Sequence, residues 1–343
     1  MSTRADAGAV TIGDPSLPAR LAERLALLDE MGDLKRIRVA AAAGSVAERA
    51  FVRAWCSIAA GADPARVAVT ECAAAAAATR LSGVDAWALL DAGCADAEVR
   101  SILDTAVGDV VGDGAPATLR ALRAAVPDLL GHAQVGHAGV APLGTPGFVT
   151  ALARQPRAGA TAPGHRRLIV EPPENHAEHC WAVAVYGALL ALDGGSGPED
   201  VGTVFLLGLA HHLHNADLPD AGFAGELALG GHLAPLVHRL TERRIAELMP
   251  GPGTRVRQAL AHARGTGTAV GAAFHAADVL DRVLQVHHHA RGAAFTAAAA
   301  LEDLDIVHDG PVAAYHDAVL AAAGLGAPRR RPRAGPAGSG PGS

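Results

Sequence analysis

The sequence predicts an all-α fold, with a helical bundle that follows a second all-helical module. Half of the 343 residues are hydrophobic, alanine is very abundant, and only 3% are aromatic. This composition favours closely packed helices over sheets, whose strands select β-branched and aromatic residues. Apolar residues recur at helical spacing through most of the chain, and no stretch alternates convincingly as a strand would.

The first half predicts a flexible lead at 1–17 and a helical module at 18–130. Ser45, with a glutamate three positions on, is a helix-start signal, and Asp63-Pro64 starts the next helix. The sequence does not indicate a role for this module. Its predicted helices cover residues 18–31, 45–60, 64–81, 84–93, 96–109 and 115–129.

A glycine- and proline-rich stretch at 131–147 predicts a linker, after which the helices become longer and more apolar. Residues 148–324 form the second predicted domain. The tail at 325–343 has the composition of a disordered segment. Helices are expected at 148–157, 175–192, 199–214, 223–249, 254–264, 268–291, 293–304 and 310–323.

Charge and hydropathy exclude two kinds of partner. The net charge is −6 and the pI is about 6.3, so no global field attracts nucleic acid or an anionic membrane. Charges interrupt the apolar runs before they reach the length of a membrane span, and the N-terminus lacks the apolar core of a signal peptide. We therefore expect a cytoplasmic protein with neither membrane nor nucleic acid as a partner.

The cysteines are scattered and form no CxxC pair, which favours buried thiols in a reducing cytosol over a disulfide framework. In the alanine-rich helix at 64–81, Glu71 is interpreted as a surface residue beside a core thiol. The four cysteines are Cys56, Cys72, Cys94 and Cys180.

The stretch LLGLAHHLHNADLPD at 206–220 carries the strongest chemical signal. Imidazole and carboxylate are common ligands of divalent metals. Adjacent histidines on a helix point about 100° apart, so His211 and His212 reach one ion only if the helix ends there. The apolar start of this stretch leads into His211, His212, His214, Asp217 and Asp220.

Two further candidate ligands lie on other predicted helices, His179 and Asp278. Ligands that project inward from several helices are a common way to build a metal site in an all-α protein. Taken singly, His179 is also interpretable as a helix-start residue, and Asp278 as the i,i+4 partner of Arg282. Together with residues 206–220, they predict a metal pocket.

Four segments carry a family pattern: Pro156-Arg157-Ala158-Gly159, then Glu174-Asn175-His176-Ala177-Glu178-His179-Cys180-Trp181, then His211 to Asp220, then Ala277-Asp278-Val279-Leu280-Asp281. In this order, residues 148–322 resemble the HD-domain superfamily of metal-dependent phosphohydrolases, in its nucleotidase-like branch. The resemblance implies an HD-type helical bundle over 148–324 and does not extend to residues 1–147.

The resemblance also implies the roles of the site residues. Arg157 would lie over a substrate phosphate, because a guanidinium matches phosphate oxygens, and Asp220 would orient water or a sugar hydroxyl. The expected activity is hydrolysis of a phosphoric monoester, either a nucleotide or another small phosphorylated molecule, and a homodimer is left open. One divalent transition metal, Mn, Co, Zn or Fe, would be held by His179, His211, His212 and Asp278.

Two positions depart from the HD pattern. His212 stands where a metal-binding aspartate is expected, and Asn215 where a catalytic glutamate is expected. Histidine keeps a ligand but removes a negative charge, whereas asparagine removes the group that would position or deprotonate water. Turnover then needs another base, for which His214, Asp217 and Asp220 are the nearest candidates.

Two other functions stay open. Some HD proteins resemble diiron oxygenases, which use extra histidines between the His-Asp pair and the final aspartate. Since His232, His238 and His262 lie in that interval, a site with two Fe is one alternative. The other is a catalytically degenerate HD protein that serves as a binding or interaction module, for which the residues at 212 and 215 are the motivation.

Overall fold

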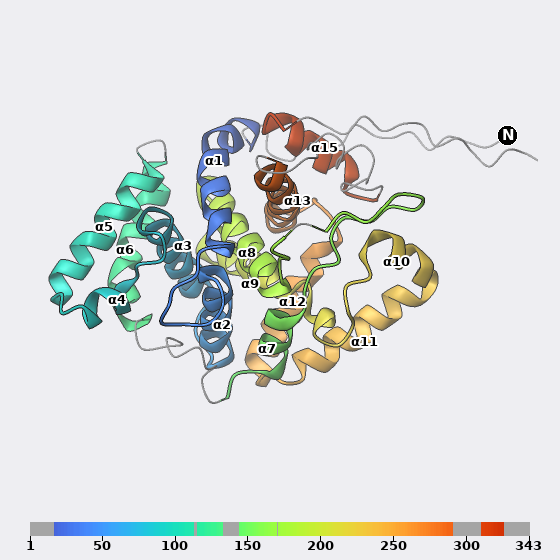
Figure 1. The fold of residues 1–343 in the computed structure, drawn as a ribbon, viewed down its shortest axis with the longest axis horizontal. Helices are drawn as coiled ribbons and strands as arrows, with labels where there is room; N and C mark the ends of the chain where they lie inside the picture. Colours follow the sequence, from blue (N-terminus) through green and yellow to red (C-terminus); the bar gives the residue numbers. More distant parts are fainter. Residues whose placement is uncertain (1–16, 113–114, 133–143, 170, 291–309, 326–343) are drawn as a thin grey trace, which may run out of the picture.

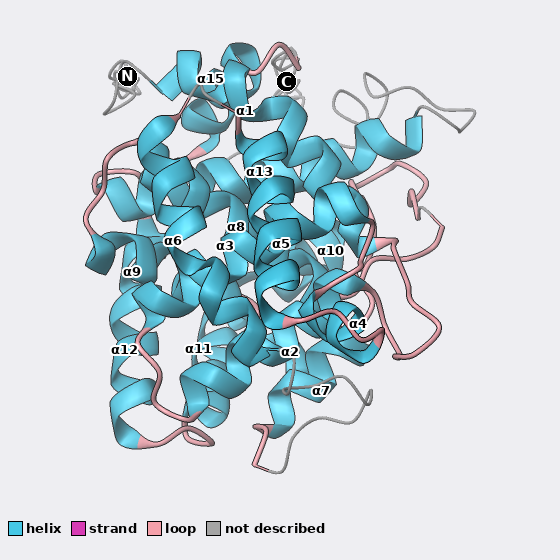
Figure 2. Cartoon of the chain, turned by 90° about the vertical axis from the view of Figure 1, so that its left-hand side faces the viewer, coloured by secondary structure: helices cyan, strands magenta, loops and turns pink. Residues whose placement is uncertain are grey.

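Every regular element that the structure describes is a helix, and the only extended pairings in the described ranges are isolated bridges (Figure 2). The all-α prediction is therefore confirmed. None of the described helices combines the length and apolarity needed to cross a membrane. Nearly all of the lead, most of the linker, the helix expected at 293–304 and nearly all of the tail lie outside the described residues. The computed structural model describes residues 17–112, 115–132, 144–169, 171–290 and 310–325.

The N-terminal helices begin and end close to the predicted positions. The Oγ of Ser45 accepts a hydrogen bond from the amide of Glu48 at 3.1 Å, and Asp63 accepts one from the amide of Ala65 at 3.4 Å, so both predicted N-caps are present. The elements are α1 (Leu17–Gly32), the 3-10 helix η1 (Asp33–Lys35), α2 (Val46–Ala59), α3 (Pro64–Leu81), α4 (Ala86–Asp91), α5 (Asp96–Val111) and α6 (Pro116–His132).

The helices of the second half differ from the prediction in two places. A single helix at 223–249 is wrong, because the chain turns at Gly230, whose φ of +52° is a left-handed conformation that glycine tolerates. Helix α9 ends at Ala210 and not at residue 214. The elements are α7 (Gly147–Arg154), α8 (His176–Asp193), α9 (Pro198–Ala210), η2 (Leu213–Ala216), α10 (Gly222–Leu229), η3 (Gly230–His232), α11 (Leu233–Ile245), α12 (Pro250–Ala261), η4 (His262–Arg264), α13 (Ala269–Ala290) and α15 (Ala313–Ala322).

Helix α8 lies at the centre of the molecule and is buried from His176 to Ala191 (Figure 1). Helices α9 and α13 pack against it, and so do α2 and α3 of the N-terminal half. Glycine at position 208 lets α9 approach closely, since a Cβ there would lie 2.5 Å from the Cα of Ala184. A helix buried all round must be apolar on every face, so the polar side chains at its start need specific partners.

One contiguous hydrophobic core joins the N-terminal helices to the later ones. Leu28 of α1, Trp55 of α2 and Phe205 of α9 all lie in it without solvent exposure. The first half therefore supplies part of the packing around α8, next to the predicted metal ligands. The domain boundary expected at 131–147 stays a prediction.

Glu71 is buried, contrary to the prediction of a surface position. Its side chain is 1% exposed, and its two oxygens accept hydrogen bonds from Arg53 at 2.8 and 2.6 Å. Since α2, α5, α6 and α9 all cover α3, a carboxylate on this helix needs a buried cation as its partner. Of the free thiols, Cys72 and Cys180 are buried, as expected, whereas Cys56 and Cys94 are half-buried.

Candidate metal centre

The predicted metal ligands come together where the start of α8, the end of α9 and the middle of α13 meet. His179 lies in the first turns of α8, His211 and His212 follow the last residue of α9, and Asp278 projects from α13. Among the described residues, the ligand atoms of the three histidines all lie within 4.8 Å of one another. The structure therefore brings the three predicted histidine ligands together, and Oδ1 of Asp278 lies 3.4 Å from Nε2 of His179.

The end of α9 explains how two adjacent histidines reach the same site. His211 caps the helix with φ −64° and ψ −17°, and His212 leaves the helical conformation with φ −109° and ψ +20°. Their ring centroids are 4.2 Å apart. The divergence expected along a continuous helix is removed because the helix stops between them.

Each of the three imidazoles is anchored through its Nδ1 atom. His179 Nδ1 lies 2.7 Å from Oδ2 of Asp281, and His211 Nδ1 lies 2.7 Å from the carbonyl oxygen of Gly208. His212 Nδ1 lies 2.8 Å from Oδ1 of Asn215. Because all three partners are acceptors, Nδ1 is the donor in each ring, and the neutral form carries its lone pair on Nε2. This is the arrangement typical of metal-ligating histidines.

Two of the Nε2 atoms face each other, those of His179 and His211, at 3.2 Å. Two nitrogens this close need either a proton between them, which makes the contact a hydrogen bond, or a cation bound to both. Two nitrogens bound at ~2.0–2.1 Å to one ion, with bond angles between a right angle and a tetrahedral one, lie roughly 2.9–3.4 Å apart. The observed separation thus fits a shared metal.

Asp278 completes the donor set with a carboxylate. Its Oδ1 lies 3.4 Å from His179 Nε2, and its Oδ2 accepts from Arg282 at 3.0 Å. The i,i+4 pair with Arg282 and the contact with the histidines therefore coexist, because each uses a different oxygen. Burial favours the neutral acid, but Arg282 and then His179 outweigh it and hold the pKa of Asp278 well below its usual range.

Burial keeps the histidines at the end of α9 neutral. It lowers the pKa of His211 to about 3, and the facing His179 adds to this effect. Burial followed by the neighbouring His211 holds the pKa of His212 well below its usual value. Since a metal binds the neutral imidazole, protons compete weakly for these nitrogens.

A second layer of buried charge lies behind His179. Asp281, three residues after Asp278 on α13, accepts from Lys35 Nζ at 2.6 Å through its free Oδ1. Lys35 also donates to Glu174 at 2.6 Å. Burial favours the neutral form of Asp281, but Lys35 and His179 hold its pKa at about 2. Glu174, His179 and Asp281 could by distance hold a second metal, yet the Lys35 ammonium already contacts both carboxylates at 2.6 Å.

A pocket of about 290 Å³ opens onto the metal centre. His211, His212 and Asp278 line it together with other polar side chains, namely Arg157, Thr161, Glu174, Asp220, Glu226, Arg282 and Gln285. The larger apolar side chains of its wall are Leu168, Ile169, Phe223 and Val286. Arg157 Nη1 is buried and has no hydrogen-bond partner among the described residues. A concave, mostly apolar site with a few converging polar groups is typical of a small-molecule pocket.

Asp220 holds the rim of this pocket. Its Oδ2 accepts from the amide of Ala158 at 2.9 Å and its Oδ1 from the amide of Gly222 at 2.9 Å. It thereby ties the loop that carries Arg157 to the start of α10. Burial raises the pKa of Asp220, but Arg157 and the two amides outweigh it and lower the pKa. An ionised Asp220 positions Arg157, whose Nε lies 3.8 Å away.

Not every predicted side chain reaches the pocket. Asp217 does not line the cavity. Its carboxylate pairs with Arg244 of α11, and Nη1 of Arg243 lies 3.8 Å from the same carboxylate. His214 is likewise absent from the lining. Of the histidines considered for a second iron, His232 and His238 are exposed and His262 contacts Thr268.

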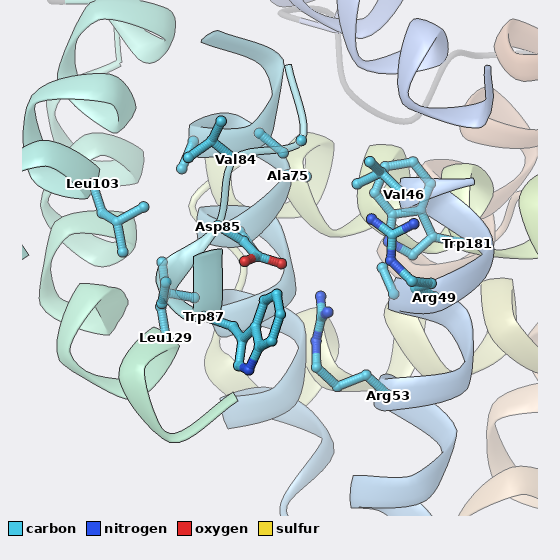
Figure 3. A pocket seen from close by; sticks show the side chains of 16 residues that line it. Val46, Arg49, Arg53, Ala75, Val84, Asp85, Trp87, Leu103, Leu129 and Trp181 are labelled. Atoms are coloured by element: carbon cyan, nitrogen blue, oxygen red, sulfur yellow. The ribbon is translucent and has the colours of Figure 1, made fainter. Parts of the chain in front are cut away.

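A second cavity of about 60 Å³ lies among α2, α3, α4 and α8 (Figure 3). Arg49, Arg53, Asp85 and Trp87 face it with alanine side chains, and Trp181 reaches it from α8. Residues two apart on a helix point in nearly opposite directions, so this cavity lies on the far side of α8 from His179. Both candidate metal groups in the described residues include His179, and none lies here.

The sequence analysis did not identify three residues that support the candidate ligands. Asp281 contacts His179, Lys35 contacts Asp281, and Asn215 contacts His212. Two signals were available. Lys35 is the only lysine in the chain, and Asp281 follows Asp278 by three positions, which places both on one helix face. The contact of Asn215 with His212 lies within one turn, but only the end of α9 sets its geometry.

Comparison with protein-family models, with curated proteins and with solved structures found no match to this chain. The resemblance to the HD superfamily therefore stays a prediction that rests on the residues quoted for it.

Proposed function

We propose that this chain is a metal-dependent phosphohydrolase that cleaves a small phosphoric monoester, such as a nucleotide. One observation carries the proposal. Three imidazoles with anchored Nδ1 atoms and one carboxylate converge at a pocket that also holds Arg157, a guanidinium with a buried, unpaired Nη1. The proposal includes a cytoplasmic location, which the free and scattered cysteines favour.

The donor set favours one borderline transition metal, such as Zn, Co or Fe, over Mg or Ca, which prefer all-oxygen sites. His179, His211, His212 and Asp278 would hold this ion, which would supply Lewis-acid polarisation of a phosphate oxygen and would favour ionisation of a water molecule.

Arg157 binds the phosphate of the substrate. Its guanidinium is held in place by Asp220, and Nη1 lacks a protein acceptor, so donors remain for phosphate oxygens. The apolar part of the wall, which includes Phe223 and Ile169, accommodates the organic part of the ester.

Glu226 is the pocket carboxylate best suited to proton transfer. It projects from α10, and burial, followed by the charge of Asp220, raises its pKa. A carboxyl group tuned towards neutrality exchanges protons more readily near neutral pH. Glu226 thereby takes the role of the glutamate that the HD pattern has at the position of Asn215. Asp220 suits this role less well, because both of its oxygens accept hydrogen bonds from backbone amides.

The alternative of two irons finds no support in the described residues. His212 has only one free nitrogen, none of the extra histidines lines the pocket, and the second carboxylate group is paired with Lys35. A degenerate binding module would have the same pocket but would not hydrolyse a phosphate ester. The activity measurement described next separates these two functions.

The test is elemental analysis of protein purified without added metal, followed by phosphate release from a panel of phosphate esters. We expect about one Zn, Co, Mn or Fe per chain and metal-dependent release. Asp278→Ala should lose both, while Asp96→Ala, on the exposed face of α5, should lose neither. Phosphate release that is equal in wild type and Asp278→Ala would falsify the hydrolase, and bound metal without turnover would favour the binding module.

A further inference from the structure

Lys35 is the only lysine among the 29 lysine and arginine residues of the chain, and it is buried. It ends the short helix η1, and its side chain is 4% exposed. Burying an ammonium group is costly unless it is paired and hydrogen-bonded. A chain that uses arginine everywhere else thus keeps its one lysine at a position where an unpaired cation would be strongly destabilising.

The contacts of Lys35 lead directly to the metal centre. Its Nζ lies 2.6 Å from Oε1 of Glu174 and 2.6 Å from Oδ1 of Asp281. The other oxygen of Asp281 accepts from Nδ1 of His179 at 2.7 Å. The Nε2 of His179 then faces His211 and Asp278. An unbroken series of charge-assisted hydrogen bonds therefore joins the N-terminal helices to a predicted metal ligand.

The geometry explains why the residue is lysine. An ammonium is compact and its three donors point in different directions, so it can contact carboxylates from two segments. A guanidinium presents a planar fork that fits one carboxylate in a bidentate way. Two arginines of this chain show that second mode, the half-buried Arg53 with Glu71 and the buried Arg24 with Asp193.

We propose that Lys35 is a positioning residue of the metal centre, which acts through Asp281 to hold His179 with its Nε2 atom towards the metal. The N-terminal helices are then part of the site. The inference rests on the proposed metal centre and adds the residue that sets the orientation of one ligand.

Removal of the ammonium has a defined consequence. Glu174 and Asp281 would then face each other without the ammonium that contacts them both, and their like charges would repel. An Asp281 side chain displaced by this repulsion is a poorer acceptor for His179 Nδ1. Loss of a hydrogen bond of this kind behind a ligand typically weakens metal affinity by about 10–100-fold.

The experiment measures metal affinity and not only activity. The metal-free full-length chain is titrated with Co²⁺, followed by its visible absorption, and with Zn²⁺ in competition with a chelator. Lys35→Met, which keeps the length of the side chain, should raise the Kd by about 10–100-fold. The control Arg66→Met removes a cation from an exposed pair with Asp128 and should leave the Kd unchanged.

A double-mutant cycle tests the route through Asp281. If Lys35 acts through this carboxylate, Lys35→Met should add little to the loss caused by Asp281→Asn. Full additivity of the two losses would overturn the inference. If Lys35→Met does not fold, Lys35→Arg is used in its place. Arginine keeps the positive charge, but its planar guanidinium cannot contact both carboxylates with the same geometry. The Kd for Co²⁺ should then rise roughly tenfold.

The outcomes separate the inference from the proposed function. Wild type that binds metal, with an equal Kd in the folded Lys35 variants, leaves the metal centre standing and overturns the role of Lys35. Wild type that binds neither Co²⁺ nor Zn²⁺ overturns both.

Discussion

The Nδ1 atom of His212 donates a hydrogen bond of 2.8 Å to Oδ1 of Asn215. The amide of Asn215 is itself fixed, because its Nδ2 donates to the carbonyl oxygen of Leu218 at 3.0 Å. These are the two positions at which the sequence departs from the HD pattern it resembles. Their contact shows that they form one unit, a candidate histidine ligand and the acceptor that orients it.

Asn215→Leu removes this acceptor with little change in volume. His212 then loses the partner that selects its tautomer, and we expect the Kd for Co²⁺ to rise by about 10–100-fold. Asn215→Asp, which keeps an acceptor oxygen, is the matched control and should retain tight binding. Equal affinity in Asn215→Leu and wild type would show that His212 needs no such anchor.

Arg157→Met should weaken substrate binding and leave metal content intact. Hydrogen bonds to charged groups contribute about 1.5–3 kcal/mol, so kcat/KM for a phosphate ester should fall by about 10–100-fold. Metal content is measured on the same samples by elemental analysis. Arg100→Met, on the exposed face of α5, is the control. A variant that loses the metal as well would place Arg157 among the groups that build the centre.

Two acidic residues give a matched comparison, one inside the pocket and one outside it. Glu226→Gln should lower kcat by about 10²-fold or more if Glu226 transfers a proton. Asp217→Asn breaks the pair with Arg244, so it should reduce the free energy of unfolding by about 0.2–1 kcal/mol and leave kcat unchanged. Initial rates and urea unfolding check both. A large fall in kcat for Asp217→Asn, with no change for Glu226→Gln, would instead assign the proton transfer to Asp217, one of the bases that the sequence predicts.

The stability of the metal-free protein should fall as the pH drops from about 6.5 towards 4. Burial, followed by Arg157, lowers the pKa of His176 to about 3, and burial lowers that of His214 to about 4. In the unfolded chain both histidines bind protons below about pH 6.5, whereas in the folded chain they stay neutral, so acid favours unfolding by up to about 1.4 kcal/mol per pH unit for each.

Urea unfolding of chelator-treated protein at several pH values measures this slope. His176→Gln should flatten it between about pH 6.5 and 5.5, above most of the range in which unfolded carboxylates titrate. His238→Gln, at an exposed position, should leave it unchanged. If the slope of His176→Gln equals that of wild type, His176 is charged in the folded protein at these pH values.

The sequence alone determined the fold class and identified the residues of the candidate metal centre. Composition and helical periodicity are local properties, and they predict the helices of α8, α9 and α13 because each needs an apolar face in the core. The sequence also indicates a metal-binding chemistry, because imidazole and carboxylate groups seldom gather at apolar helix ends without a partner. These groups belong to His179, His211, His212 and Asp278.

Only the tertiary structure decided which groups support those ligands and which do not reach them. Lys35 meets Asp281 across 246 positions of the chain, and no periodicity encodes such a contact. Asp217 looks equivalent to Asp220 in the sequence, yet Arg244 of α11 holds it outside the pocket. The break at Gly230 sets the direction of α11, and thus this pairing, because a left-handed backbone turn ends a helix whatever the surrounding apolar pattern.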